Sequence, residues 1–91
     1  MPLKIYYKNV EKPLKNHKVE VLEGDVVKLL DRFVDKEKLY KIQTVNNISQ
    51  YYNYFLTCYI LDLETLTEGY RKIPISELIF VTRDFEDPEH F

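Results

Sequence analysis

Residues 51–61 read YYNYFLTCYIL, a run without charge, proline or glycine in which aromatic and branched side chains dominate. Such side chains fill a pleated, buried surface well, so the run predicts a long central β-strand. Successive side chains of a strand point to opposite faces. The even positions are expected to face the core, namely Tyr52, Tyr54, Leu56, Cys58 and Ile60. The odd positions then point outward, among them Tyr51, Phe55 and Tyr59.

Further strands are predicted on both sides of this run. Short β-prone segments precede it at 3–7, 19–22, 26–30 and 39–45, and others follow it at 70–73 and 79–82. Gly24 favours a turn because glycine adopts positive φ without strain, and Asn46-Asn47 favours a second turn. Residues 32–38 are dense in charge and predict an exposed loop. A hairpin tip is expected at 65–69.

A helix remains the alternative for residues 26–39. Apolar residues at 26, 29, 30, 33 and 34 also fit the 3.6-residue period of an amphipathic helix. Val26, Val27 and Val34 are β-branched, however, and Gly24 lies just upstream. Because these residues favour a strand, we adopt the strand as the prediction.

Residues 73–81 read IPISELIFV and predict how the sheet is completed. Pro74 has no N–H to donate, so a strand ends there, and residues 74–78 predict a single helical turn before the last strand. Taken with the turn Glu23-Gly24-Asp25 ahead of an apolar strand, this pattern resembles the end of SH3-like small β-barrels. In those barrels a proline-containing 3₁₀ turn joins the fourth strand to the fifth. The resemblance spans about residues 19–82 and concerns the fold alone.

The resemblance implies an all-β fold, either a small SH3-like barrel or a strongly curved antiparallel sheet of five to six strands. The aromatic peptide-groove motif of eukaryotic SH3 domains, an Ala-Leu-Tyr-Asp-Tyr run, is missing from this chain. We therefore transfer no binding residue from that family. The fold by itself does not specify a function.

Length and charge divide the chain into three parts. Ninety-one residues suit one domain, and an apolar content of 45% allows a core. Residues 1–18 carry five lysines and one glutamate, and we expect them to form an N-terminal strand and a basic arm. Residues 19–82 are expected to form the β domain and residues 83–91 an acidic tail. Whether the arm packs on the domain stays open.

Catalytic and metal chemistry have little support in the sequence. The lone cysteine, Cys58, lies in the most apolar run, which favours an inert buried thiol. The two histidines, His17 and His90, lie outside the predicted strands. The acidic residues of the hairpin tip and the tail are expected to be solvated, namely Asp62, Glu64, Glu68, Asp84, Glu86, Asp87 and Glu89. Two glycines are too few for a glycine-rich phosphate loop. We therefore expect no enzymatic activity, no cofactor and no metal.

The start of the chain bears on location. Lys4 and Lys8 stand where the apolar core of a signal peptide would lie, and no apolar run approaches the ~20 residues of a membrane span. We therefore expect a soluble, cytoplasmic protein without membrane contact. A single unpaired thiol fits that reducing compartment.

Nucleic-acid binding is the first alternative function. Surface aromatic rings can stack on bases, and a series of lysines could contact phosphates, namely Lys4, Lys8, Lys12, Lys15 and Lys18. The net charge of −2, however, disfavours a polyanion as the partner. A ribonuclease toxin built on an SH3-like barrel is the second alternative. Such toxins also begin with a Gly-Asp turn, but the basic catalytic residues expected beside their central sheet are missing here.

Protein–protein association is the function that the sequence favours. Eight tyrosines are difficult to hide in one small core, and tyrosine is enriched at interfaces. The candidate interface residues are Tyr51, Phe55, Tyr59, Arg32, Phe33 and Tyr70. Pairing of sheet edges would give a homo-oligomer. The frequent Lys, Asn, Tyr and Ile indicate an AT-rich bacterial or bacteriophage genome, in which an adaptor or inhibitor of a larger host complex is the expected role.

Overall fold

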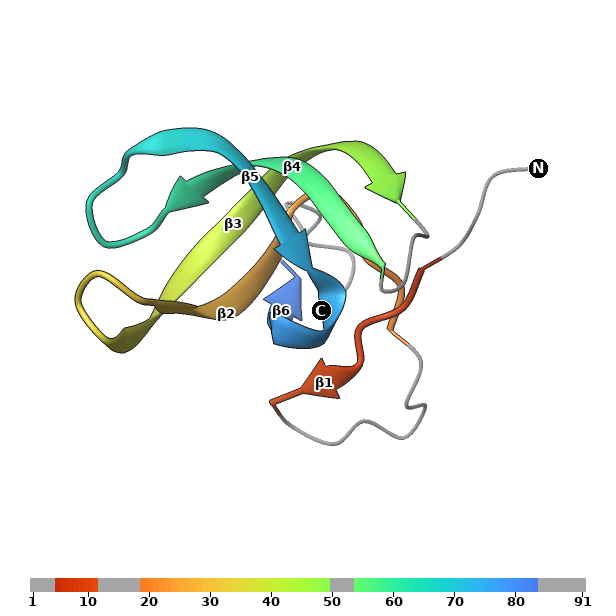
Figure 1. Ribbon diagram of the computed structural model, residues 1–91, viewed down its shortest axis with the longest axis horizontal. Coiled ribbons are helices and arrows are strands. Elements are labelled where there is room, and N and C mark those ends of the chain that lie inside the picture. The colour runs from red at the N-terminus through yellow and green to blue at the C-terminus, as the bar shows by residue number, and fades with distance from the viewer. Residues whose placement is uncertain (1–4, 12–18, 50–53, 84–91) are drawn as a thin grey trace, which may run out of the picture.

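The computed structural model describes residues 5–11, 19–49 and 54–83, apart from the side chains of residues 47 and 49. Within these ranges the chain is all-β, which confirms the predicted fold class (Figure 1). The strands are β1 (Asn9–Val10), β2 (Asp25–Asp31), β3 (Lys36–Ser49), β4 (Phe55–Asp62), β5 (Glu68–Pro74) and β6 (Ile79–Arg83), and the 3₁₀ turn η1 (Ile75–Glu77) precedes β6. None of the described residues belongs to a helix long and apolar enough to cross a membrane.

The strands form one strongly curved sheet in the order β1-β6-β2-β3-β4-β5. Neighbouring strands are antiparallel, except that β1 runs parallel to β6. The sheet does not close into a barrel, so β1 and β5 are its two edges in the described part of the chain. Figure 1 shows the β2–β3 and β4–β5 hairpins projecting toward the same side of the molecule.

β2 begins at the predicted glycine turn. Gly24 has a φ of 92°, a conformation that favours glycine, and β2 starts at the next residue. The strand was the correct choice over a helix, because burial alternates along the segment. Val27 is buried, whereas Val26 and Lys28 on either side are half-buried. The predicted loop at 32–38 is a shorter turn at 32–35, since β3 already begins at Lys36.

β3 is longer than predicted, and the turn expected at Asn46-Asn47 was wrong. The strand runs through that position to Ser49. The pairing of β3 with β4 shifts register twice, once between Ile42 and Thr44 and once between Val45 and Asn47. Such bulges accommodate an unpaired residue and increase the local twist of a strand. The asparagine-rich stretch therefore curves the strand rather than reversing the chain.

β4 contains the core of the run that was predicted to be central. Leu56, Cys58 and Ile60 are buried, which confirms the predicted inward face for these three residues. Tyr54 was predicted to face inward, but it is exposed. It lies one residue ahead of β4, where strand alternation no longer fixes the side chain, and its carbonyl accepts the N–H of Ile75. Tyr52, also predicted to be inward, lies outside the described residues.

The C-terminal elements follow the prediction closely. The β4–β5 turn spans residues 63–67, and Gly69, expected at the tip, already pairs with Ile60 in β5. β5 ends at Pro74 and η1 follows, as the missing proline N–H predicted. β6 then returns antiparallel beside β2.

The N-terminal segment packs on the sheet. Ile5 and Tyr7 are buried in the core, and the N–H of Tyr7 donates to the carbonyl of Val19 at 2.9 Å. Tyr6 forms an isolated bridge with Glu20. Of the strand predicted at 3–7, residues 5–7 pair antiparallel with residues 19–21 through this bridge, and a separate short strand, β1, pairs with β6 at the edge.

Candidate functional site

The ends of the two hairpins carry the most exposed large hydrophobic side chains of the described residues. Phe33 and Val34, in the β2–β3 turn, are 101% and 56% exposed. Leu66, in the β4–β5 turn, is 71% exposed, and Tyr70, three residues into β5 from that turn, is 63% exposed. We call these four residues the hairpin-end surface. A clustered set of exposed apolar side chains marks an interaction site more often than scattered ones do.

Aspartates fix the conformation of both turns. Asp31 Oδ1 accepts the N–H of Phe33 at 2.9 Å. Asp62 Oδ1 accepts the N–H groups of Glu64 at 2.8 Å and of Thr65 at 3.2 Å. Such side-chain bonds to the backbone stabilise tight turns. Leu66 has a φ of 61°, an unfavourable backbone conformation for a residue with a side chain, so the turn keeps this residue at a cost in strain.

Ion pairs join the two hairpins below their tips. Lys36 Nζ lies 3.0 Å from Glu64 Oε2, and Lys38 Nζ lies 2.5 Å from Asp62 Oδ2. The side chains of Lys38 and Asp62 are only 8% and 12% exposed. The acids of this turn were predicted to be solvated. This is wrong for Asp62, which the pairing of β3 with β4 places beside Lys38, whereas the Glu64 side chain is 55% exposed, as predicted, although it pairs with Lys36.

These pairs shift the titration of their members. The hydrogen bond from Lys38, aided by the N–H groups of Glu64 and Thr65, lowers the pKa of Asp62 to about 2. The same hydrogen bond raises the pKa of Lys38. Lys36 in turn lowers the pKa of Glu64. All three effects keep both pairs charged at neutral pH, so ion pairs connect the two hairpins beneath the hairpin-end surface at that pH.

An aromatic surface runs along β4 and β5 on the outward face. It consists of Phe55, Tyr59 and Tyr70, and the rings of the two tyrosines meet edge to face with centroids 4.8 Å apart. A hydrogen bond between the Tyr59 hydroxyl and the Glu68 carboxylate raises the pKa of Tyr59. The ammonium of Lys72 lies 5.2 Å from the centre of the Phe55 ring, a favourable cation–π distance.

A groove of about 250 Å³ lies between the end of β2, the β2–β3 turn, β5 and η1. Phe33 of the hairpin-end surface lines it, and so does Lys72, whose ammonium lies over the Phe55 ring of the aromatic surface. At the groove Arg32 Nη2 lies 3.4 Å from Glu77 Oε1, in an exposed ion pair. The groove therefore adjoins the hairpin-end surface at Phe33 and reaches β5 at Lys72, next to Phe55.

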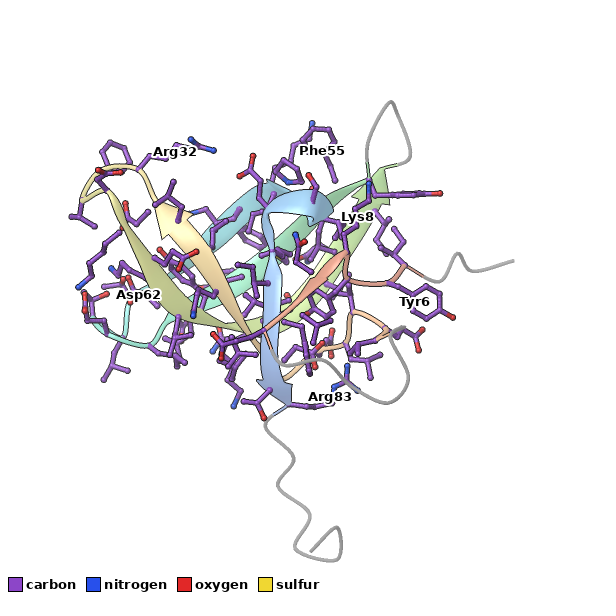
Figure 2. All side chains as sticks on the ribbon, turned by 90° about the horizontal axis from the view of Figure 1, so that it is seen from below. Tyr6, Lys8, Arg32, Phe55, Asp62 and Arg83 are labelled. Atoms are coloured by element: carbon purple, nitrogen blue, oxygen red, sulfur yellow. The ribbon has the colours of Figure 1, made fainter. Side chains whose placement is uncertain are left out.

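The structure places several of the predicted interface residues on these two surfaces or in the groove. Phe33 and Tyr70 belong to the hairpin-end surface, Phe55 and Tyr59 lie half-buried on the outward face of β4, and Arg32 lines the groove. Tyr51 lies outside the described residues. Figure 2 shows Arg32 and Asp62 at one end of the molecule and Tyr6 and Lys8 at the other.

Two residues of the hairpin-end surface were missed by sequence reasoning. Val34 was read as part of a strand or helix pattern, and Leu66 was overlooked among the polar residues of its turn. The sequence did offer one signal: each is an apolar residue in a predicted turn or loop, where a side chain has no core to pack against.

A buried ion pair organises the opposite end of the sheet. Asp25 is fully buried, and Arg83 Nε donates to its Oδ1 at 2.5 Å, while the Tyr7 hydroxyl donates to its Oδ2 at 2.9 Å. Burial and the nearby Asp25 charge raise the pKa of Tyr7. The N–H of Leu22 also donates to Asp25 Oδ2. These groups satisfy the hydrogen-bonding capacity of the buried carboxylate, so we assign them a structural role.

The candidate reactive groups are placed as follows. Cys58 is a buried free thiol, and burial raises its pKa to about 11, which keeps it protonated at neutral pH. No three His, Cys, Asp or Glu side chains among the described residues stand together as metal ligands would. Lys8 is exposed on the N-terminal segment, whereas Lys4, Lys12, Lys15, Lys18 and both histidines lie outside the described residues.

The chain matches no protein-family model, no curated protein and no solved structure.

Proposed function

We propose that this protein is a non-catalytic protein-binding module that contacts its partner through the hairpin-end surface, the groove and the aromatic surface. The observation that carries the proposal is that the four most exposed large hydrophobic side chains of the described residues all belong to the two hairpins at one end of the sheet. Aromatic and aliphatic groups of this kind form the buried centre of protein interfaces.

Rigidity of the surface supports the same proposal. Binding costs free energy when side chains and loops become ordered. Here the Lys36–Glu64 and Lys38–Asp62 pairs connect the hairpins before any partner arrives. Hydrogen bonds from the backbone N–H groups of Glu64 and Thr65 to Asp62 likewise order the turn that carries Leu66. Less ordering is then required on binding.

The biological setting is part of the proposal. The composition of the chain suggests a bacterial or bacteriophage source, and a small module of this type suits an adaptor or inhibitor of a larger host complex. We place it in the cytoplasm, where the lone thiol of Cys58 stays reduced.

Nucleic-acid binding through the lysine arm stays a prediction. Only Lys8 of its five lysines falls among the described residues. The aromatic surface would supply base stacking, with Lys72 beside Phe55 to contact a phosphate. A ribonuclease activity also stays a prediction.

Affinity capture from a bacterial lysate, with and without nuclease, tests the proposal. We expect the tagged chain to retain a stoichiometric protein partner after nuclease treatment. The variant Phe33→Ser/Leu66→Asn should lose that partner, because it removes two apolar side chains of the proposed contact surface. It should still fold, because both side chains are exposed and lie outside the core. Asparagine tolerates the positive φ at Leu66. Tyr6→Ser, at the other end of the molecule, is the matched control.

Three results would count against the proposal. Partners that vanish with nuclease would favour nucleic-acid binding. Retention of the partner by Phe33→Ser/Leu66→Asn would show that another surface is used. An equal loss in Tyr6→Ser would point to general destabilisation, which thermal unfolding followed by circular dichroism detects.

A further inference from the structure

The open edge of β5 carries a pattern that a second copy of this chain would complement. β5 is an edge strand of the sheet, and the described residues place no strand beside it. β1 at the other edge has only two residues and offers little to pair with. Open edges are the usual sites of strand addition.

The hydrogen-bond pattern shows which backbone groups face that edge. At one end of the β4–β5 pairing, the N–H of Ile75 donates to Tyr54, and at the other the N–H of Asp62 donates to Thr67. The register between them has no bulge. In an antiparallel ladder the direction of the N–H and C=O groups alternates along each strand. Arg71 and Ile73 therefore point these groups at β4.

Tyr70 and Lys72 consequently point their N–H and C=O groups at the open edge. A second observation supports this direction for Tyr70. The Arg71 guanidinium donates a hydrogen bond to the carbonyl of Tyr70 at 3.1 Å, so this carbonyl is not engaged by β4. Arg71 is exposed, so water competes for this bond. A pairing strand would have to displace the guanidinium from the carbonyl.

We propose that β5 pairs antiparallel with β5 of a second copy, centred on Tyr70, to form a two-fold dimer with one continuous sheet. In this register Tyr70 stands opposite the partner's Tyr70. Glu68 then stands opposite the partner's Lys72, and the partner's Glu68 opposite Lys72. Opposite charges facing each other across an antiparallel pair are stabilising.

Neighbouring residues fit this register. Glu68, Tyr70 and Lys72 lie on the same face of β5, so the two tyrosines meet beside the Tyr59 rings and extend the aromatic surface across the axis. Glu68 already accepts a hydrogen bond from Tyr59, and a carboxylate has capacity for further donors. Pro74 lacks an N–H and ends the pairing. A lysine ordinarily discourages pairing at an edge, but here a glutamate of the same strand faces it.

The dimer shares Tyr70 with the hairpin-end surface but uses none of its turn residues, Phe33, Val34 and Leu66, so variants of those turn residues test the partner proposal separately from the dimer. Phe33→Ser/Leu66→Asn should dimerise like the parent chain. Variants of Glu68 and Lys72 alter the edge and leave both turns unchanged.

Sedimentation velocity over micromolar to millimolar concentration tests the dimer by charge exchange. We expect the parent chain to dimerise with rising concentration. Lys72→Glu alone and Glu68→Lys alone should each weaken dimerisation about tenfold, because each turns two attractive pairs into repulsive ones. An equimolar mixture of the two variants should dimerise again, since every facing pair is then opposite in charge. Lys8→Glu, with the same change in net charge as Lys72→Glu, is the control and should behave as the parent chain.

Amide hydrogen exchange locates the contact. The Tyr70 and Lys72 amides should gain protection as concentration rises, whereas those of Arg71 and Ile73 should be protected throughout. A chain that stays monomeric at the highest concentration overturns the proposal. Dimers that ignore both charge changes, a mixture that fails to associate, or protection gained away from β5 would also overturn it.

Discussion

The carboxylate of Asp25, the first residue of β2, binds the guanidinium of Arg83, the last residue of β6, with Oδ1 and Nε 2.5 Å apart. The same guanidinium also donates to the carbonyl of Glu20 at 2.6 Å. Tyr7 completes the site through its hydroxyl. One buried carboxylate thus joins the N-terminal segment, the start of β2 and the end of the described chain.

Asp25→Ala is expected to lower the free energy of unfolding by about 3–5 kcal/mol, because it leaves Arg83 and Tyr7 without their partner in a buried setting. Urea unfolding followed by circular dichroism measures the loss. Glu37→Ala, an exposed acid on β3, should change stability by no more than about 0.5 kcal/mol. A loss for Asp25→Ala as small as that of the control would contradict a central role for the pair.

The Lys38–Asp62 pair predicts a loss of stability in acid. The pKa of Asp62 is lowered from its ordinary value of 3.8 to about 2 in the folded chain. The unfolded chain therefore binds this proton more readily, so the free energy of unfolding should fall as the pH drops from 3.8 toward 2. The contribution is fully present above that window.

Unfolding midpoints in urea at pH 2, 3, 4 and 7 test this dependence. Asp62→Asn should be less stable than the parent chain at pH 7, and the difference should shrink toward pH 2. Lys36 and Glu64 form a neighbouring pair, so Glu64→Gln shows how much of the acid dependence comes from Glu64 instead. A constant difference between Asp62→Asn and the parent chain at every pH would mean that the pair does not stabilise the fold electrostatically.

Local sequence patterns predicted most of the fold. The turn at Gly24 and the end of β5 at Pro74 each follow from the backbone chemistry of one residue. The inward side chains of β4 follow from the alternation of side chains along a strand. The turn expected at Asn46 was wrong, because a bulge and a turn both accommodate asparagine. Only the pairing of β3 with β4 shows that this asparagine pair lies in a bulged strand and not in a turn.

The candidate site was less predictable, because it depends on contacts between distant residues. Phe33 and Tyr70 were proposed from residue type alone, whereas Val34 and Leu66 join them only because the hairpins end at the same side. The Lys38–Asp62 pair likewise depends on the register of β3 against β4. Asp25 gave no sign of burial in the sequence, where it followed a glycine like any turn aspartate.

Leu56→Ala tests which face of β4 is the core. Leu56 is fully buried, so its truncation should cost about 2–5 kcal/mol through lost burial and a residual cavity. Thr57→Ala, its neighbour on the outward face, should cost about 0.5 kcal/mol or less. Urea unfolding midpoints of the two variants give the comparison. A larger loss for Thr57→Ala than for Leu56→Ala would mean that the faces are reversed.

The two glycines allow a matched test of the turn before β2. Gly24 has a φ of 92°, so Gly24→Ala forces a side chain into an unfavourable conformation and should cost about 1–2 kcal/mol. Gly69 lies in the extended backbone of β5, and an added Cβ would meet only the end of the flexible Arg71 side chain, at 3.2 Å. Gly69→Ala should therefore change the free energy of unfolding by about 0.5 kcal/mol or less. Thermal unfolding of both variants measures the difference, and equal losses would show that the positive φ at Gly24 is not what the turn requires.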